Sequence, residues 1–212
     1  MSDFSLEILL GRIIGLIIGF TLHEFAHAWT AYRLGDNTPY FQRRLTLDPR
    51  SHIEPMGLIL ALLAGFGWAK PVPVNPRAFY PNETRGLMIV SLAGPVMNLL
   101  IATVLAVFMR LMIAIGLLNT YGFFYNVLFT VLFFNLVLFL FNLIPLSPLD
   151  GFKIAVGILP PEQSRTLMRY ERETMLALIL IIMMSAISWG RLNILGAVLG
   201  PPLRFLLNLL LG

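Results

Sequence analysis

The sequence predicts an all-α polytopic membrane protein, with about five to six membrane helices and a re-entrant or β-like segment near a candidate metal site. Composition is the first reason, because hydrophobic residues make up 58% of the 212 residues and charged residues only 12%. A soluble domain carries about a quarter charged residues. The mean hydropathy of +0.81 also indicates a membrane protein. The length suits a single domain over residues 1–212.

The distribution of apolar residues along the chain is the second reason. Polar connections separate apolar stretches at 8–32, 56–67, 86–117, 124–146, 174–189 and 192–211. A helix needs roughly 20 apolar residues to cross the hydrocarbon core, so the first, third, fourth and sixth stretches qualify. The fifth is somewhat short. The second is too short to cross, and we expect a re-entrant element there, shielded by protein or by a cavity.

Charged residues in the connections predict the orientation. Lysine and arginine gather in the connections 33–50, 68–85 and 153–173, whereas 118–125 carries no charge. By the positive-inside rule the three basic connections are cytoplasmic, which puts the N-terminus outside. The net charge of +4 therefore indicates contact with anionic lipid headgroups and no nucleic-acid partner.

Proline spacing predicts an irregular segment at residues 68–81. Pro71, Pro73 and Pro76 exclude both a helix and pairing in the centre of a sheet. We expect this segment to be extended, as an edge strand or as a polyproline-like stretch.

Two histidines four residues apart lie inside the first apolar stretch. His23 and His27 would share one face of a helix, where both imidazoles can bind a single Zn²⁺. Glu24 is adjacent, in the general-base position of a zinc hydrolase. A carboxylate inside an apolar span is costly, and pairing with a basic residue at a helix contact is the alternative explanation. These residues are expected near the cytoplasmic end of the first span, below the membrane surface.

A catalytic zinc site usually takes a third protein ligand. The chain has no cysteine, which leaves histidine and carboxylate side chains. Asp150 follows an apolar stretch ended by Pro145 and Pro148, which free backbone groups and can turn a side chain inward. An N-cap on the next helix explains Asp150 equally well. His52 lies in a charged loop, and we expect an ordinary loop histidine there.

Helix breaks and buried amides are further candidates. Gly94 and Pro95 are expected to interrupt the third span, and with residues 65–67 they could line a water channel. Asn98 and Asn142 are intramembrane amides that can hydrogen-bond across helices. A structural packing role is the simpler explanation for each of them.

Four motifs, taken in order, resemble the site-2 protease family (peptidase family M50). They lie at residues 23–27 (His-Glu-x-x-His), 70–76, 93–98 and 142–151. The resemblance covers residues 23–151, and residues 160–212 carry no recognised motif. It is closest to a short form of the family, because 212 residues leave no room for PDZ or CBS domains.

The resemblance implies an intramembrane zinc metalloprotease, with a motif-bearing core over about 8–160 and C-terminal membrane helices over about 174–211. His23, His27 and Asp150 would be the ligands of one Zn²⁺, and Glu24 would be the catalytic base. Asn142 would lie near the metal and hydrogen-bond the substrate or stabilise the tetrahedral intermediate. The implied partners are a transmembrane protein substrate, membrane lipid and an unidentified adaptor or regulator, in a prokaryotic cell membrane.

A metal transporter, or another membrane metal-binding protein, is the alternative. Transporters also place histidine and aspartate in broken helices near the membrane midplane. Glu24 argues against transport, because a permeation site needs no general base, and the chain shows no inverted repeat. For a protease, the segment Val72–Asn75 could pair with an unwound substrate by β-addition, and a surface loop is the equally good interpretation.

Overall fold

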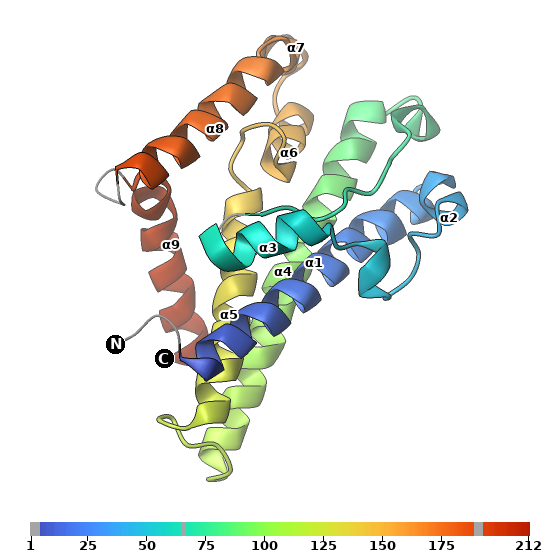
Figure 1. Ribbon diagram of the computed structural model, residues 1–212. Coiled ribbons are helices and arrows are strands. Elements are labelled where there is room, and N and C mark those ends of the chain that lie inside the picture. Colours follow the sequence, from blue (N-terminus) through green and yellow to red (C-terminus); the bar gives the residue numbers. More distant parts are fainter. Residues whose placement is uncertain (1–4, 65–66, 189–192) are drawn as a thin grey trace.

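The computed structural model describes residues 5–64, 67–188 and 193–212, and the regular secondary structure of these residues is helical apart from one isolated β-bridge (Figure 1). The α-helices are α1 (Leu6–Arg33), α2 (Thr38–Phe41), α3 (Pro55–Ala64), α4 (Glu83–Ala114), α5 (Phe123–Asn142), α6 (Asp150–Ile158), α7 (Pro161–Arg169), α8 (Glu171–Ile187) and α9 (Ile194–Leu211). Two 3₁₀ helices, η1 (Pro49–Ser51) and η2 (Pro76–Phe79), lie before and after α3. The predicted all-α class is confirmed for this part of the chain.

Four helices of the described chain are long and apolar enough to cross a membrane, namely α1, α4, α5 and α9. They correspond to the first, third, fourth and sixth apolar stretches, as expected. α3 has 10 residues and a length of about 15 Å, half the hydrocarbon thickness. α8 has 17 residues and is not among the four. The expected number of five to six membrane helices is therefore not confirmed.

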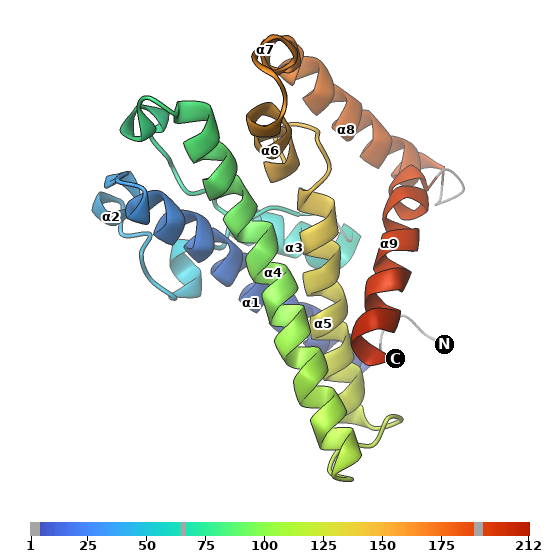
Figure 2. The same ribbon diagram turned by 180° about the vertical axis from the view of Figure 1, so that it is seen from behind.

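α1, α4 and α5 pack against one another and form the centre of the fold (Figure 1 and Figure 2). Three glycines of α1, spaced four residues apart, face α5: Gly11, Gly15 and Gly19. A Cβ on Gly11 would lie 2.5 Å from Cβ of Thr130, and a Cβ on Gly19 would lie 2.7 Å from Cδ1 of Leu138. Small residues at this spacing let the two helix backbones approach closely.

α3 packs on the middle of α1. Ala61 of α3 is buried together with Leu16 and Phe20 of α1. The chain before and after α3 is joined by the β-bridge, in which Ile53 pairs with Ala69. The short helix is thereby closed into a hairpin-like element on the outside of the α1 and α5 pair.

The segment after α3 is extended only as far as Asn75. The expectation that residues 68–81 are extended throughout is wrong beyond that point, because η2 begins at Pro76. The side chain of Asn75 accepts a hydrogen bond from the N–H of Arg77 at 3.2 Å, and Pro76 has the φ angle that a helix start requires. The cap at Asn75 therefore starts a 3₁₀ helix at a place where the proline spacing alone predicts an extended chain.

The expected interruption of the third span is also wrong. α4 continues through Gly94 and Pro95 without a break. A proline inside a membrane helix removes one backbone hydrogen bond, and packing against neighbouring helices compensates for it. Pro95 is fully buried here. The other break that was expected to line a water channel comprises residues 65–67. Residues 65 and 66 lie outside the described residues.

Candidate metal centre

α1 and α6 bring three potential metal ligands together. His23 and His27 lie one turn apart on α1, and Asp150 is the first residue of α6, which packs against α4. The two Nε2 atoms are 3.0 Å apart, and Oδ2 of Asp150 lies 3.1 Å from Nε2 of His23 and 3.2 Å from Nε2 of His27. Within the described residues, this is the one group of three metal-ligating side chains whose donor atoms lie within 4.8 Å of one another.

The second nitrogen of each imidazole shows where the protons are. Nδ1 of His27 lies 2.7 Å from the carbonyl oxygen of Val90, and Nδ1 of His23 lies 2.6 Å from Oδ1 of Asn98. Because both oxygens can only accept, both Nδ1 atoms donate. The Nε2 atoms of the neutral imidazoles are then unprotonated. Three proton acceptors meet with no hydrogen between them, an arrangement that a bound cation stabilises.

Two imidazoles and one carboxylate fit zinc. Zinc–ligand bonds of about 2.0–2.1 Å in a tetrahedron place the ligand atoms about 3.3 Å apart. The separations of 3.0–3.2 Å found here are close to that value. The cluster therefore has the ligand chemistry and spacing to bind one Zn²⁺.

Asp150 does not occupy the cap position that was its alternative explanation. The N-cap residue of α6 is Leu149, and the carboxyl group of Asp150 points to the two histidines. The position of Asp150 supports its interpretation as an anionic ligand.

Asn98 joins the metal centre to the interior of the helix bundle. Its Nδ2 donates to the carbonyl of Gly19 at 3.2 Å and to Oδ1 of Asn135 at 3.0 Å, while its Oδ1 accepts from His23. Both asparagines are fully buried. Asn135 has no counterpart among the predicted residues, and the signal that could have found it is a second amide inside the fourth apolar stretch.

Glu24 is buried and lines a cavity beside the three ligands. Its Oε2 accepts the N–H of Val72 at 3.1 Å. Val72 stands between Pro71 and Pro73, so this N–H is the only one that the tripeptide can offer. No lysine or arginine in the described chain forms an ion pair with Glu24, which removes support from the alternative of a structural salt bridge.

Arg44 holds the residues directly before Val72. Its buried guanidinium group donates to the carbonyl of Ser51, to that of Lys70 at 3.3 Å and to that of Pro71 at 3.2 Å. The N–H of Lys70 also donates to the carbonyl of His52 at 2.8 Å. Arg44 was predicted only as one of several basic residues in a cytoplasmic connection. Its neighbours in the sequence give no signal of this role.

The two remaining predicted residues lie in different places. Asn142 is the last residue of α5 and lines the cavity, and its Nδ2 donates to the carbonyl of Leu138 at 3.0 Å. His52 lies outside the metal group. It is fully buried, and its ring contacts the carbonyl of Thr46 through Nε2 at 2.8 Å.

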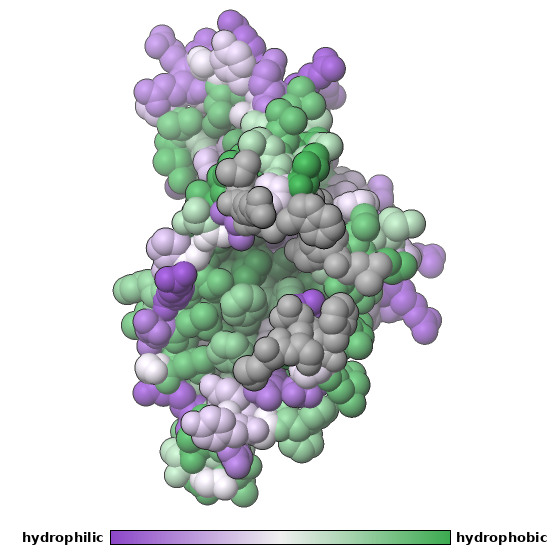
Figure 3. All heavy atoms as spheres, turned by 60° about the vertical axis from the view of Figure 1, so that its left-hand side comes forward, coloured by the Kyte–Doolittle hydropathy of each residue, from purple (hydrophilic) through white to green (hydrophobic). Residues whose placement is uncertain are grey.

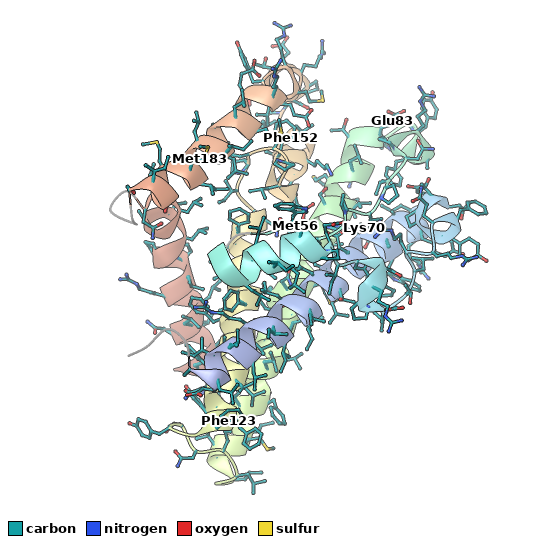
Figure 4. All side chains as sticks on the ribbon, viewed as in Figure 1. Met56, Lys70, Glu83, Phe123, Phe152 and Met183 are labelled. Atoms are coloured by element: carbon teal, nitrogen blue, oxygen red, sulfur yellow. The ribbon has the colours of Figure 1, made fainter. Side chains whose placement is uncertain are left out.

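The cavity beside the metal centre has a volume of about 520 Å³. Its lining is mostly apolar and comes from α1, α5, the extended segment and α8: Phe20, Leu138, Val72, Val74, Leu178, Ile182 and Met183. A hollow lined by hydrophobic residues is visible in the middle of the face in Figure 3. Figure 4 shows Met183 on α8 and Phe152 on α6, the two helices above the end of α5. The cavity suits apolar side chains that extend from a polar reacting centre.

Gly94 allows α4 to pack directly against the two histidine rings. A Cβ at this position would lie 2.5 Å from Nε2 of His27 and 2.6 Å from Cε1 of His23. Real Cβ atoms do not approach other atoms so closely, so only glycine fits without moving a ligand.

We expect Gly94→Ala to weaken zinc binding by roughly 10-fold or more, because the new methyl group displaces both imidazoles. The measurement is the zinc content of the purified protein after dialysis against a weak chelator. Gly200→Ala is the matched control, since a Cβ on this glycine of α9 meets nothing within 4 Å. Equal zinc retention in the two variants would contradict the proposed packing of α4 against the ligands.

Comparison with known proteins gives consistent relatives. The family model of peptidase family M50 matches residues 11–186. "Putative zinc metalloprotease YwhC" of Bacillus subtilis (strain 168) is 46% identical over 161 residues, which cover 74% of this chain and 73% of that protein. "Putative zinc metalloprotease Rip2" of Mycobacterium tuberculosis (strain ATCC 25618 / H37Rv) is 33% identical over 159 residues, which cover 73% of this chain and 60% of that protein. No solved structure matches the chain.

The matched residues include every side chain of the candidate metal centre. They also include α4, α5 and all of α1 from residue 11 onward, three of the four helices that can cross a membrane. The resemblance noted in the sequence is thereby confirmed, and the chain belongs to peptidase family M50.

Proposed function

We propose that this chain is an intramembrane zinc metalloprotease that hydrolyses peptide bonds in or near transmembrane segments of membrane proteins. The family and the names of the relatives support a zinc metalloprotease that acts on protein. One observation carries the intramembrane part of the proposal. His23 and His27 belong to α1, a helix apolar enough to cross a membrane, and both lie before its last turn.

His23, His27 and Asp150 would hold the metal through Nε2, Nε2 and Oδ2. When bound, zinc supplies a Lewis acid that polarises the scissile carbonyl group and lowers the pKa of a water molecule toward about 7. Glu24 takes the proton from the attacking water and passes it to the leaving amine. The N–H of Val72 donates a hydrogen bond to Oε2 of Glu24. We therefore assign the proton transfer to the other carboxylate oxygen, Oε1.

The substrate segment must unwind before it can be cut, because a helix shields its own carbonyl groups with hydrogen bonds. The apolar cavity accepts the side chains of such a segment, and Asn142 lies in its wall. We assign the side chain of Asn142 to a hydrogen bond with the substrate backbone or with the tetrahedral intermediate. α3, packed on the middle of α1, is the re-entrant element of this proposal.

Strand pairing between the substrate and Val72–Asn75 is restricted by hydrogen bonds that the segment already makes. The N–H of Val72 donates to Glu24, and the N–H of Asn75 donates to Oδ2 of the buried Asp36 at 2.7 Å. Pro73 has no N–H. Within the described chain, Val74 carries the one N–H of this segment that has no partner. We therefore propose that the N–H of Val74 is the donor through which this segment pairs with a substrate strand.

The basic connections support a membrane orientation with the metal centre toward the cytoplasm. The C-terminal end of α1, the N-terminal end of α4 and α7 lie toward one end of the molecule (Figure 1), and the uncharged connection before Phe123 lies at the other (Figure 4). The positive-inside rule places the first end in the cytoplasm. Bacterial relatives support a prokaryotic cell membrane as the location. The transporter alternative is not favoured, because these relatives are named as metalloproteases.

The central experiment compares the wild type with Glu24→Gln in detergent. We expect both proteins to retain one zinc ion by elemental analysis, because Glu24 is not a ligand. Only the wild type should cleave a transmembrane test substrate, since the amide cannot take the proton from water. Zinc in both proteins with cleavage by Glu24→Gln would remove Glu24 as the base. No stoichiometric zinc in either protein would contradict the proposed function itself.

We expect Val74→Pro to lower kcat/KM for a transmembrane substrate by roughly 3- to 10-fold, the effect of losing one hydrogen bond. Val74→Ala is the matched control, because it removes the same side-chain packing and keeps the N–H. Zinc content should not change in either variant. Indistinguishable cleavage by the two variants would contradict strand pairing at Val74.

The orientation can be tested by cysteine labelling, because the natural chain has no cysteine. Thr120 lies in the uncharged connection and Gln163 lies in α7, and both are exposed. In intact cells a membrane-impermeant maleimide should label Thr120→Cys, and it should label Gln163→Cys only after permeabilisation. The reverse pattern would place the metal centre toward the outside.

A further inference from the structure

A row of buried amide groups crosses the centre of the fold and ends at the metal centre. It begins at the carbonyl of Val131 on α5, continues through Asn135 of α5 and Asn98 of α4, and reaches His23 of α1. The three hydrogen bonds are 2.9, 3.0 and 2.6 Å long. The two asparagines are fully buried, and the His23 ring is buried as well. Because these side chains are buried from solvent, each hydrogen bond constrains the next.

The donor and the acceptor of every hydrogen bond in the row can be assigned by starting from the carbonyl of Val131. The carbonyl of Val131 can only accept, so the Asn135 atom beside it must be Nδ2 and the other must be Oδ1. Oδ1 of Asn135 faces Asn98, which must therefore donate from Nδ2. Nδ2 of Asn98 also faces the carbonyl of Gly19 at 3.2 Å, a second acceptor. The oxygen of Asn98 is then the atom left for His23.

The two histidines differ in how their tautomer is fixed. Nδ1 of His27 donates to the backbone carbonyl of Val90, which cannot turn around. Nδ1 of His23 faces a side-chain amide, which could rotate and present a donor instead. A rotated Asn98 would place an oxygen against both Gly19 and Asn135, two acceptors. Asn135 thus supplies one of the two contacts that keep the oxygen of Asn98 toward His23.

We propose that Asn135 is a positioning residue that acts through Asn98 to keep the proton of His23 on Nδ1 and the lone pair of Nε2 directed at the metal. This inference rests on the proposed function, because it takes His23 as a ligand. Asn135 is on α5, separated from the histidine by one whole side chain, and has no contact with the reacting atoms. Groups that orient a metal-bound histidine in this way typically change metal affinity by roughly 10- to 100-fold when they are removed.

The test uses the full-length chain in detergent and changes only the far end of the row. Asn135→Leu and Asn135→Met replace the amide by apolar side chains of similar size. Thr130→Val is the matched control, because Thr130 is buried on the same helix and its hydroxyl donates to the carbonyl of Asn126 four residues earlier, away from the row.

Two quantities are measured. The first is the dissociation constant for Zn²⁺, from competition with a chromophoric chelator. The second is the ¹⁵N spectrum of the histidine rings in metal-free protein at mildly alkaline pH, with His23 assigned by its loss in His23→Gln. The spectrum reports which ring nitrogen carries the proton and does not depend on zinc or on catalysis.

We expect the Leu and Met variants to bind zinc roughly 10- to 100-fold more weakly and to lose the Nδ1–H form of His23 as the single tautomer. Thr130→Val should keep both wild-type properties. A wild-type tautomer in the Leu and Met variants would overturn the inference, and so would an equal loss of zinc affinity in Thr130→Val. If the wild type binds no zinc, the proposed function fails, while the tautomer measurement still decides the role of Asn135.

Discussion

Three proton acceptors that meet in an apolar setting are the constraint on which this structure depends. Nε2 of His23, Nε2 of His27 and Oδ2 of Asp150 lie within 3.2 Å of one another, and the hydrogen bonds of both Nδ1 atoms leave no proton between them. Without a cation this arrangement is repulsive in its neutral-imidazole form. Helices α1, α4 and α6 nevertheless bring the three groups together at this point, an arrangement that suits a bound cation.

The surroundings of the three ligands serve the same arrangement. Gly94 brings α4 against both rings, and the extended segment after α3 presents the N–H of Val72 to Glu24. That segment is itself held by the buried guanidinium of Arg44. The candidate metal centre and Glu24 are thus positioned by α4, by the extended segment and by the connection that carries Arg44. Buried hydrogen bonds of this kind keep a polar site ordered.

Residue spacing and apolar length predicted those parts of this site whose residues lie close together in the sequence. The four-residue spacing of His23 and His27 placed both rings on one helix face, and apolar length identified α1, α4, α5 and α9. Asp150 remained open between cap and ligand, because its distance from His23 depends on how α6 packs. The predicted break at Gly94 and Pro95 was wrong, since proline spacing says nothing about the packing that keeps α4 helical. Arg44 and Asn135 act through contacts distant in sequence, which no local pattern contains.

X-ray absorption at the zinc edge would test the central claim most directly, because it reports the ligands themselves. The sample is the full-length chain in detergent, loaded with one equivalent of Zn²⁺, with Asp150→Ala measured beside it. The account predicts two imidazole nitrogens and a carboxylate oxygen at about 2.0–2.2 Å in the wild type, with the carboxylate contribution lost in Asp150→Ala. A spectrum with fewer than two imidazoles, or one that Asp150→Ala leaves unchanged, would contradict it.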